Sequence, residues 1–286
     1  MSAAPVNESW TVLKVLEWTA GYFRERGIES ARLDADLLLA ATLEVDRVGL
    51  YLRYDQPLQA QELSRFRALV ARRARREPLA YILGEAEFWS LSFKVSSGVL
   101  IPRPDTEVLV EEALACGPAE ARVLDVGTGS GALAVALVVE RPAWQMTALD
   151  VSNLALEVAT GNAARHGVRE RIRFLLGDLA HLPEEEFDLI IANPPYIPSD
   201  DLSGLMADVR DFEPHLALDG GADGLAAYRA LASQAPTRLS PGGWLLVEIG
   251  QGQEVAVTEL FQQAGLGEIH TRADYAGIIR VVGGRI

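Results

Sequence analysis

The stretch Arg122-Val123-Leu124-Asp125-Val126-Gly127-Thr128-Gly129-Ser130-Gly131-Ala132-Leu133 decides the fold of this chain. A short apolar run ends at three alternating glycines, and apolar residues at helical spacing follow directly. This order predicts a strand, a tight turn and a helix. Because glycine has no side chain, the backbone at Gly127, Gly129 and Gly131 can turn sharply and approach a ligand closely. The unpaired N–H groups at the start of the helix face the same place.

The residues around the glycines point to one kind of ligand. The glycine spacing alone also fits the dinucleotide fingerprint. Asp125, however, lies at the carboxyl end of the predicted strand, where its carboxylate can pair with a ligand ammonium, and a pyrophosphate gains nothing from that charge. The Asp-x-Gly-x-Gly-x-Gly pattern resembles the first motif of the Rossmann-like methyltransferases that use S-adenosylmethionine (SAM). We therefore expect the turn, with Thr128 and Ser130, to bind SAM; a tight turn without a ligand is the plainer alternative.

Strands and helices alternate over residues 104–286, which predicts an α/β fold with a Rossmann-like, doubly wound, mostly parallel seven-stranded sheet. Ligands of such sheets bind at the carboxyl ends of the strands. Four polar residues stand at predicted strand ends, namely Asp125, Asp150, Asp178 and Asn193. Beyond the quoted stretch, the predicted strands are residues 146–149, 172–176, 187–192, 243–249, 268–272 and 278–282, and the predicted helices are residues 154–166, 226–239 and 255–264.

Two of these carboxylates have positions that suit the adenosine part of SAM. Asp150 lies about 20 residues after the glycines, where an acidic side chain can bind both ribose hydroxyls. Asp178 is placed to meet an adenine amino group, with Leu179 packing on the ring. The alternatives are a helix cap for Asp150 and a turn residue for Asp178. Neither role needs a metal, and we expect none at this site.

Asn193-Pro194-Pro195-Tyr196 follows the fourth predicted strand and is the most specific signal in the chain. Two consecutive prolines remove backbone donors and fix φ, so the carbonyl groups of the loop are rigidly aimed. The amide oxygen of Asn193 and the carbonyl of Pro194 can accept both N–H bonds of a planar amino or amide group, while the ring of Tyr196 stacks on it. We expect Asn193, Pro194 and Tyr196 to act in catalysis, and all four residues to bind the acceptor.

Three segments together resemble one family. They are the glycine motif, Asn-Pro-Pro-Tyr-Ile, and the upstream Ile-Pro-Arg-Pro-Asp-Thr-Glu of residues 101–107. They are similar to the HemK-type protein-glutamine N5-methyltransferases, which modify peptide-chain release factors. The resemblance covers essentially the whole chain. It implies that SAM binds at the glycine turn and near Asp150, Asp178 and Leu179, and that Asn193 to Tyr196 hold the glutamine amide of a Gly-Gly-Gln loop. Arg103 is a further expected substrate contact.

The organisation of the chain suggests three parts. Residues 1–84 have apolar residues at helical spacing and are expected to form a small helical domain, which the resemblance assigns to contact with the release factor. Residues 85–103 are expected to form a hairpin linker with its turn at residues 96–98, and residues 104–286 the methyltransferase domain. Six arginines in residues 65–76 form either a solvated helix end or a docking patch for an anionic partner.

Charge and composition narrow the cellular setting. Residues 1–85 hold 12 basic and 12 acidic residues, whereas residues 86–286 hold 14 and 28, so the whole net charge of −14 lies in the second part. Such an acidic domain is poorly suited to grip nucleic acid directly. Residues 1–10 show no leader pattern, and no apolar run is long enough to span a bilayer. The single cysteine, Cys116, has no neighbouring His in the sequence, and we expect it to be a small packed residue. We expect a cytoplasmic monomer.

The expected reaction is direct in-line transfer of the SAM methyl group to an amide nitrogen. Because the lone pair of that nitrogen is delocalised, the enzyme must position it and exclude water. No general base is evident, since the four histidines stand singly in polar or helix-end contexts. Three rivals remain: an adenine amino-group methyltransferase acting on nucleic acid, a glutamine methyltransferase acting on a ribosomal protein, and a non-catalytic SAM-binding module.

Overall fold

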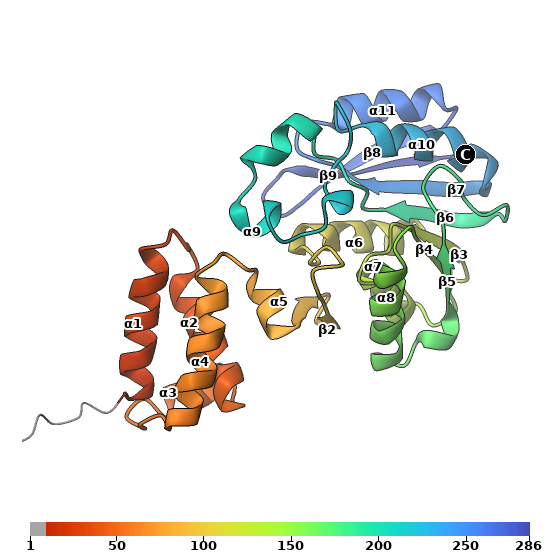
Figure 1. Cartoon of the computed structure of the whole chain (residues 1–286). Helices are drawn as coiled ribbons and strands as arrows, with labels where there is room; N and C mark the ends of the chain where they lie inside the picture. Colours follow the sequence, from red (N-terminus) through yellow and green to blue (C-terminus); the bar gives the residue numbers. More distant parts are fainter. Residues whose placement is uncertain (1–9) are drawn as a thin grey trace, which may run out of the picture. The chain divides into compact units, whose positions relative to one another are not determined.

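The computed structural model describes residues 10–286 (Figure 1). Two compact units divide the chain, Met1–Leu83 and Gly84–Ile286, and each is described by itself. Residues 1–9 lie outside the described residues, and with them most of the segment expected to lack a leader. Within residues 10–286, no helix combines the length and the apolar composition needed to cross a membrane.

The first unit is a small helical bundle, as the sequence predicts. Its helices bury their apolar faces in one shared core that includes Leu16, Phe23 and Leu39. The side chain of Thr11 caps the first helix by accepting a hydrogen bond from the backbone N–H of Lys14. The helices are α1 (Val12–Arg24), α2 (Ala31–Leu43), α3 (Arg47–Tyr51), α4 (Ala60–Arg73) and α5 (Leu79–Leu83).

The arginines of residues 65–76 do not form one uniform solvated face. Arg73 is buried and pairs with Asp34 of α2, with 2.6 Å between Nε and Oδ2. Arg76 donates to the carbonyl oxygen of Gly27 at 2.7 Å. Since these two guanidinium groups tie α4 and the residues after it to α2 and to the loop between α1 and α2, they stabilise the bundle itself.

A hairpin opens the second unit, but its turn differs from the expected one. Strands β1 (Glu85–Phe88) and β2 (Leu91–Lys94) pair in antiparallel register around Trp89 and Ser90, whose φ angles are 52° and 57°. A turn does form at residues 96–98, where the backbone N–H of Val99 donates to the carbonyl oxygen of Ser96 at 3.1 Å, but it follows the hairpin and does not connect its two strands. Tertiary contacts decide the position of the hairpin turn, because the backbone N–H of Trp89 donates to the carboxylate of Glu107 at 2.7 Å and its ring N–H donates to Glu140 at 2.8 Å.

A seven-stranded sheet forms the centre of the second unit and confirms the predicted fold class. The strand order is β5-β4-β3-β6-β7-β9-β8, and β9 runs in the opposite direction to the other six strands. The reversal at β3 and β6 creates the crevice where ligands of such sheets bind. The strands are β3 (Arg122–Val126), β4 (Gln145–Asp150), β5 (Ile172–Leu176), β6 (Phe187–Ala192), β7 (Leu239–Glu248), β8 (Gly267–Ala273) and β9 (Ile279–Arg285).

Helices cover both faces of this sheet (Figure 1). Alternate strand residues belong to two cores: Val123 and Met146 pack with α6, α7 and α8, whereas Leu124 and Leu245 pack with α10 and α11. The helix predicted over residues 226–239 ends earlier, because Pro236 interrupts it and a 3-10 turn follows. The helices are α6 (Glu107–Cys116), α7 (Ala132–Glu140), α8 (Asn153–Arg165), α9 (Ala207–Arg210), α10 (Ala226–Gln234) and α11 (Glu254–Gln263).

Candidate active site

The quoted stretch forms the strand, tight turn and helix that the sequence predicts. After β3, the backbone N–H groups of Gly127 and Thr128 both donate to the carbonyl oxygen of Leu149, at 2.8 and 3.0 Å. The φ angles of Gly127, Gly129 and Gly131 are 76°, 56° and 80°, a region that favours glycine. The turn is thus fixed against the neighbouring strand β4.

The three glycines have two different roles. A Cβ atom added at Gly127 or Gly129 would meet nothing within 4 Å, so these positions leave open space beside the backbone. At Gly131 an added Cβ would lie 2.9 Å from the Cβ of Ala159 on α8. The expectation that all three admit a ligand is therefore corrected, because Gly131 serves the close packing of α7 on α8.

Asp125 lies beneath the turn and not on its open side. Its side chain is fully buried, and Oδ2 accepts a hydrogen bond from the Thr128 hydroxyl at 2.6 Å. Burial raises the pKa of Asp125 to about 7, against the opposing effect of the Thr128 bond. Among residues 10–286, Oδ1 has no hydrogen-bond partner. Direct pairing with a ligand ammonium, as expected from the sequence, does not fit this position; Asp125 supports the turn.

Asp150 closes the turn from the end of β4. One carboxylate oxygen accepts from the backbone N–H of Gly129 at 2.8 Å and the other from that of Ser152 at 2.9 Å. Each oxygen keeps a lone pair for a further donor. Asp178, by contrast, is exposed, and its pKa is lowered chiefly by the bond to His181, whose Nδ1 lies 3.0 Å from Oδ1.

A cavity of about 470 Å³ joins these elements, within the range of roughly 300–1,000 Å³ typical of small-molecule sites. Seven predicted site residues, which follow the ends of four strands, line this cavity. They are Gly127, Gly129, Asp150, Asp178, Leu179, Asn193 and Pro195. The other predicted site residues do not line it, and they are Arg103, Asp125, Thr128, Ser130, Gly131, Pro194 and Tyr196.

The side-chain amide of Asn193 is oriented by Thr106, and Glu248 lies near Thr106; neither residue is among the predicted site residues. Nδ2 of Asn193 donates to the hydroxyl of Thr106 at 3.1 Å, and that hydroxyl lies near the carboxyl of Glu248 on β7, whose Oε2 has no hydrogen-bond partner among residues 10–286. Glu248 is buried, and desolvation raises its pKa to about 7, although the nearby Thr106 hydroxyl and Arg280 oppose this. The Thr106 oxygen accepts from Nδ2 of Asn193, which commits that amide group. The amide oxygen of Asn193 is left for another donor.

One sequence signal could have pointed to this arrangement. Glu248 is a lone acidic residue within a predicted apolar strand, and buried acidic side chains are rare without a partner. Thr106 lies in the upstream segment of residues 101–107 that carries the family resemblance.

Tyr196 is held by its backbone from two sides. Its carbonyl oxygen accepts from Nε2 of Gln253 at 3.0 Å. An added Cβ at Gly220 would lie 2.8 Å from the Cα of Tyr196, so that segment packs closely on the loop. The ring is largely buried, which raises the pKa of its hydroxyl. Tyr196 is therefore a rigid end of the Asn193 loop.

Arg103 is already engaged within the unit. Its guanidinium forms an ion pair with the buried carboxylate of Glu213, which also lies 3.4 Å from the backbone N–H of Ile101. The pair ties the segment before α6 to the segment after α9, and both segments contribute to the cavity wall. Arg103 thus positions the wall, and the structure does not place it on the cavity as a substrate contact.

The comparisons with known proteins identify the family of this chain. Family models described as the PrmC N-terminal domain and the methyltransferase small domain match residues 14–84 and 104–207. A release factor glutamine methyltransferase of Geobacter sulfurreducens is 52% identical over 280 residues, which are 98% of this chain and 98% of that protein. The chain belongs to the release factor glutamine methyltransferase family. A relative of the same name from Cereibacter sphaeroides is 46% identical and covers 91% of this chain and 93% of its own length.

Membership in the release factor glutamine methyltransferase family confirms the resemblance seen in the motifs, and with it that the chain is a SAM-dependent methyltransferase. A solved methyltransferase from Pyrococcus furiosus superposes with a TM-score of 0.52 at 18% identity, covering 68% of this chain and 88% of its own. At that identity the likeness shows the fold alone, which is the predicted Rossmann-like fold.

Proposed function

We propose that this chain transfers a methyl group from SAM to the side-chain amide nitrogen of the glutamine in the Gly-Gly-Gln loop of peptide-chain release factors. One observation carries the proposal: the open glycine turn and the oriented amide of Asn193 line the same cavity. Family membership supports the choice of substrate, since the relatives are named for it.

The residues present suit SAM as the methyl donor. Open space beside Gly127 and Gly129 lets a ligand lie against backbone N–H groups. The spare lone pairs of Asp150 would accept ribose hydroxyls, and Leu179 offers an apolar surface for the adenine ring. When bound, SAM supplies an activated methyl group on a sulfonium.

Asn193 would hold the acceptor amide and orient its nitrogen. Its Oδ1 accepts one N–H bond of the substrate amide, because Nδ2 is committed to Thr106. Pro194 would contribute its carbonyl oxygen, and Pro195 and Tyr196 would keep the loop rigid. Holding the nitrogen in line for attack removes on the order of 7–11 kcal/mol from the barrier. Acceptor oxygens beside the nitrogen also stabilise the positive charge that develops on it.

The first unit would recognise the release factor, and the second would carry the reaction. We propose residues 1–84 for recognition, residues 85–103 as the connecting segment and residues 104–286 for catalysis, with the enzyme acting as a cytoplasmic monomer. The acidic balance of residues 86–286 supports a protein substrate over direct contact with nucleic acid.

The test is a substrate competition read by mass spectrometry. The protein is incubated with SAM and, in separate reactions, a release factor, ribosomal proteins and adenine-containing RNA or DNA, and any added methyl group is mapped. We expect modification of the Gly-Gly-Gln glutamine alone. A release factor in which that glutamine is replaced by asparagine is the control, and it should remain unmodified. Methylation of a ribosomal protein or of adenine instead would overturn the substrate assignment.

A further inference from the structure

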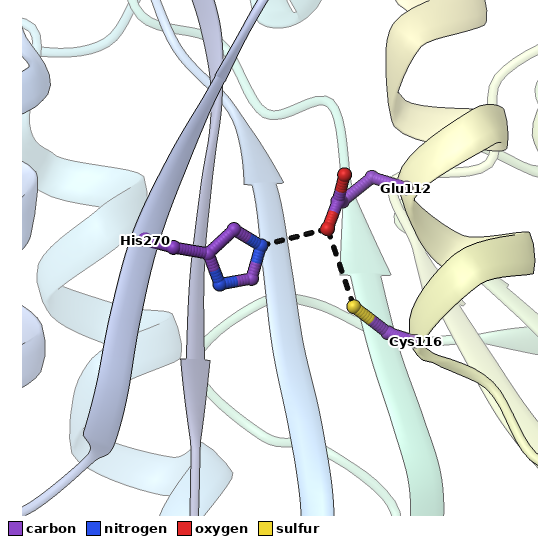
Figure 2. Close-up of side chains that lie close together, drawn as sticks. All are labelled: Glu112, Cys116 and His270. Atoms are coloured by element: carbon purple, nitrogen blue, oxygen red, sulfur yellow. Dashed lines mark hydrogen bonds and ion pairs between the residues drawn. The ribbon is translucent and has the colours of Figure 1, made fainter.

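A cluster of three potential metal ligands lies on the second unit, apart from the SAM cavity. Glu112 and Cys116 are one helical turn apart on α6, and His270 faces them from the edge strand β8 (Figure 2). The three side chains point toward one another, and their donor atoms all lie within 4.8 Å. Cys116 has no neighbouring histidine in the sequence, because His270 lies 154 residues further along the chain and only the fold brings the two together.

The distances are close to those of a metal site. Nε2 of His270 lies 2.7 Å from Oε1 of Glu112, and Sγ of Cys116 lies 3.3 Å from the same oxygen. Ligands in a tetrahedral zinc site are roughly 3.3–3.6 Å apart, given metal–ligand bonds of about 2.0–2.3 Å. An ion bound by all three donors therefore requires Nε2 of His270 and Oε1 of Glu112 to move apart by about 0.6 Å.

The ordinary alternative is a His–Glu ion pair, and it leaves the thiol unexplained. A histidine and a carboxylate pair without help, but here the only thiol of the chain is aimed at the same oxygen atom. Burial and the neighbouring carboxylate raise the pKa of Cys116 to about 12, so the free thiol is a poor nucleophile. A catalytic or redox-sensing role for Cys116 is thereby disfavoured.

The surroundings balance the charge of a bound dication. A carboxylate, a thiolate and a neutral imidazole carry two negative charges together. Arg272 approaches Glu112 at 3.6 Å but is paired with Glu111 at 3.0 Å, and Arg285 is paired with Glu268 at 3.1 Å. No nearby guanidinium thus remains uncompensated at this place within residues 10–286.

The histidine is also oriented by its neighbours. Nδ1 of His270 lies 3.5 Å from the carbonyl oxygen of Glu268, and the ring meets that of Trp244 edge-on at 5.1 Å. A proton on Nδ1 leaves the lone pair of Nε2 toward the cluster, an arrangement common among metal-binding histidines. The His270 side chain is 34% exposed, so an ion and a water ligand have access.

We propose that Glu112, Cys116 and His270 bind one Zn²⁺ ion, with water as the fourth ligand, and that the ion fastens the edge strand β8 to helix α6. Mixed sulfur, nitrogen and oxygen ligands in a tetrahedral set favour zinc over magnesium or calcium. On binding, the thiol proton passes to solvent and a sulfur–zinc bond forms. The site is structural, because none of its ligands lines the SAM cavity.

The test uses the full-length, untagged protein, freed of metal by chelation. Co²⁺ is titrated in, and the absorption of a thiolate–cobalt bond is recorded, which only Cys116 can produce in this chain. We expect one Co²⁺ per chain, displaced by one Zn²⁺. Cys116→Ser should abolish the band and His270→Ala should weaken binding at least about tenfold.

A matched control and a second readout keep the test decisive. His181→Ala removes the histidine of a second histidine–carboxylate pair, with Asp178, which has no thiol beside it, and should leave the band unchanged. Zn²⁺ should raise the melting temperature of the parent and of His181→Ala, but not of Cys116→Ser. Absence of the band in the parent, equal affinity in His270→Ala, or no zinc-dependent rise in melting temperature of the parent would each overturn the proposal.

Discussion

The glycine turn and the Asn193 loop are both supported by a carboxyl–threonine pair, but the two pairs act on different parts of the site. Each has a buried carboxyl close to a threonine hydroxyl, and burial raises the pKa of both carboxyls to about 7. In the turn, Asp125 and Thr128 are three residues apart. Under the loop, Glu248 meets Thr106 from a distant part of the chain.

The sequence separation within each carboxyl–threonine pair decides which part of the site that pair holds in place. The local pair fixes a backbone, because Asp125 lies beneath the turn and its partner belongs to the turn itself. The long-range pair fixes a side chain, since Thr106 decides which atom of the Asn193 amide faces the cavity. A motif can therefore specify the binding turn alone, whereas the reactive loop depends on the assembled fold.

The largest effect should follow removal of the oriented amide. Asn193→Ala should lower kcat for methyl transfer by about 10²–10³-fold, comparable to losing one preorganised group in other enzymes, while SAM affinity measured by calorimetry changes much less. Asn153→Ala, at the exposed start of α8, is the matched control. A kcat equal to that of the parent would remove Asn193 from the acceptor site.

Substitutions within the turn should separate its two kinds of glycine. Gly129→Ala places an alanine in a left-handed conformation, which costs about 1–2 kcal/mol of stability. Gly131→Ala adds the contact with Ala159 and should cost about 1–3 kcal/mol more. Urea unfolding of both variants measures this. Equal losses of stability would show that helix packing does not require Gly131.

Thr106→Val should separate orientation from binding. The variant keeps the shape of the side chain but removes the bond to Asn193, so we expect kcat to fall about tenfold with the KM for SAM unchanged. Thr106→Ser restores a hydroxyl and should recover most of the rate. If serine rescues no better than valine, the hydroxyl does not orient the amide.

The smallest effects should appear in the pH dependence of stability. Burial raises the pKa of Asp125 from 3.8 and that of Glu248 from 4.5 to about 7 in the folded protein. The free energy of unfolding that each protonated carboxyl contributes is therefore fully present at low pH and is lost as the pH rises to about 7. Each carboxyl contributes a slope of at most about 1.4 kcal/mol per pH unit.

Asp125→Asn and Glu248→Gln should each flatten that decline when unfolding is measured without SAM between pH 4 and 8. Glu259→Gln, an exposed site on α11, should follow the parent curve. A decline that persists unchanged in either buried variant would show that the corresponding carboxyl is ionised in the folded protein across this range.

Local patterns were sufficient to predict the sheet, the glycine turn and the Asn193 loop. The bounds of β5 and β6 match the predicted strands, and the apolar run of β6 is buried, as is typical of a central parallel strand. Three features escaped because they arise from tertiary contacts. The hairpin turns at Trp89, because Glu107 accepts the backbone N–H of that residue. Asp125 is buried beneath the glycine turn that it precedes in the sequence. Thr106 lies near Glu248 because the start of α6 packs near β7.

The most direct measurement is a crystal structure of the enzyme with S-adenosylhomocysteine and a peptide containing Gly-Gly-Gln. We predict the glutamine amide nitrogen about 2.9 Å from Oδ1 of Asn193, with Nδ2 still bonded to Thr106 and the nitrogen facing the ligand sulfur. A glutamine side chain bound away from Asn193, or an Asn193 amide turned so that Nδ2 faces the substrate, would contradict the account.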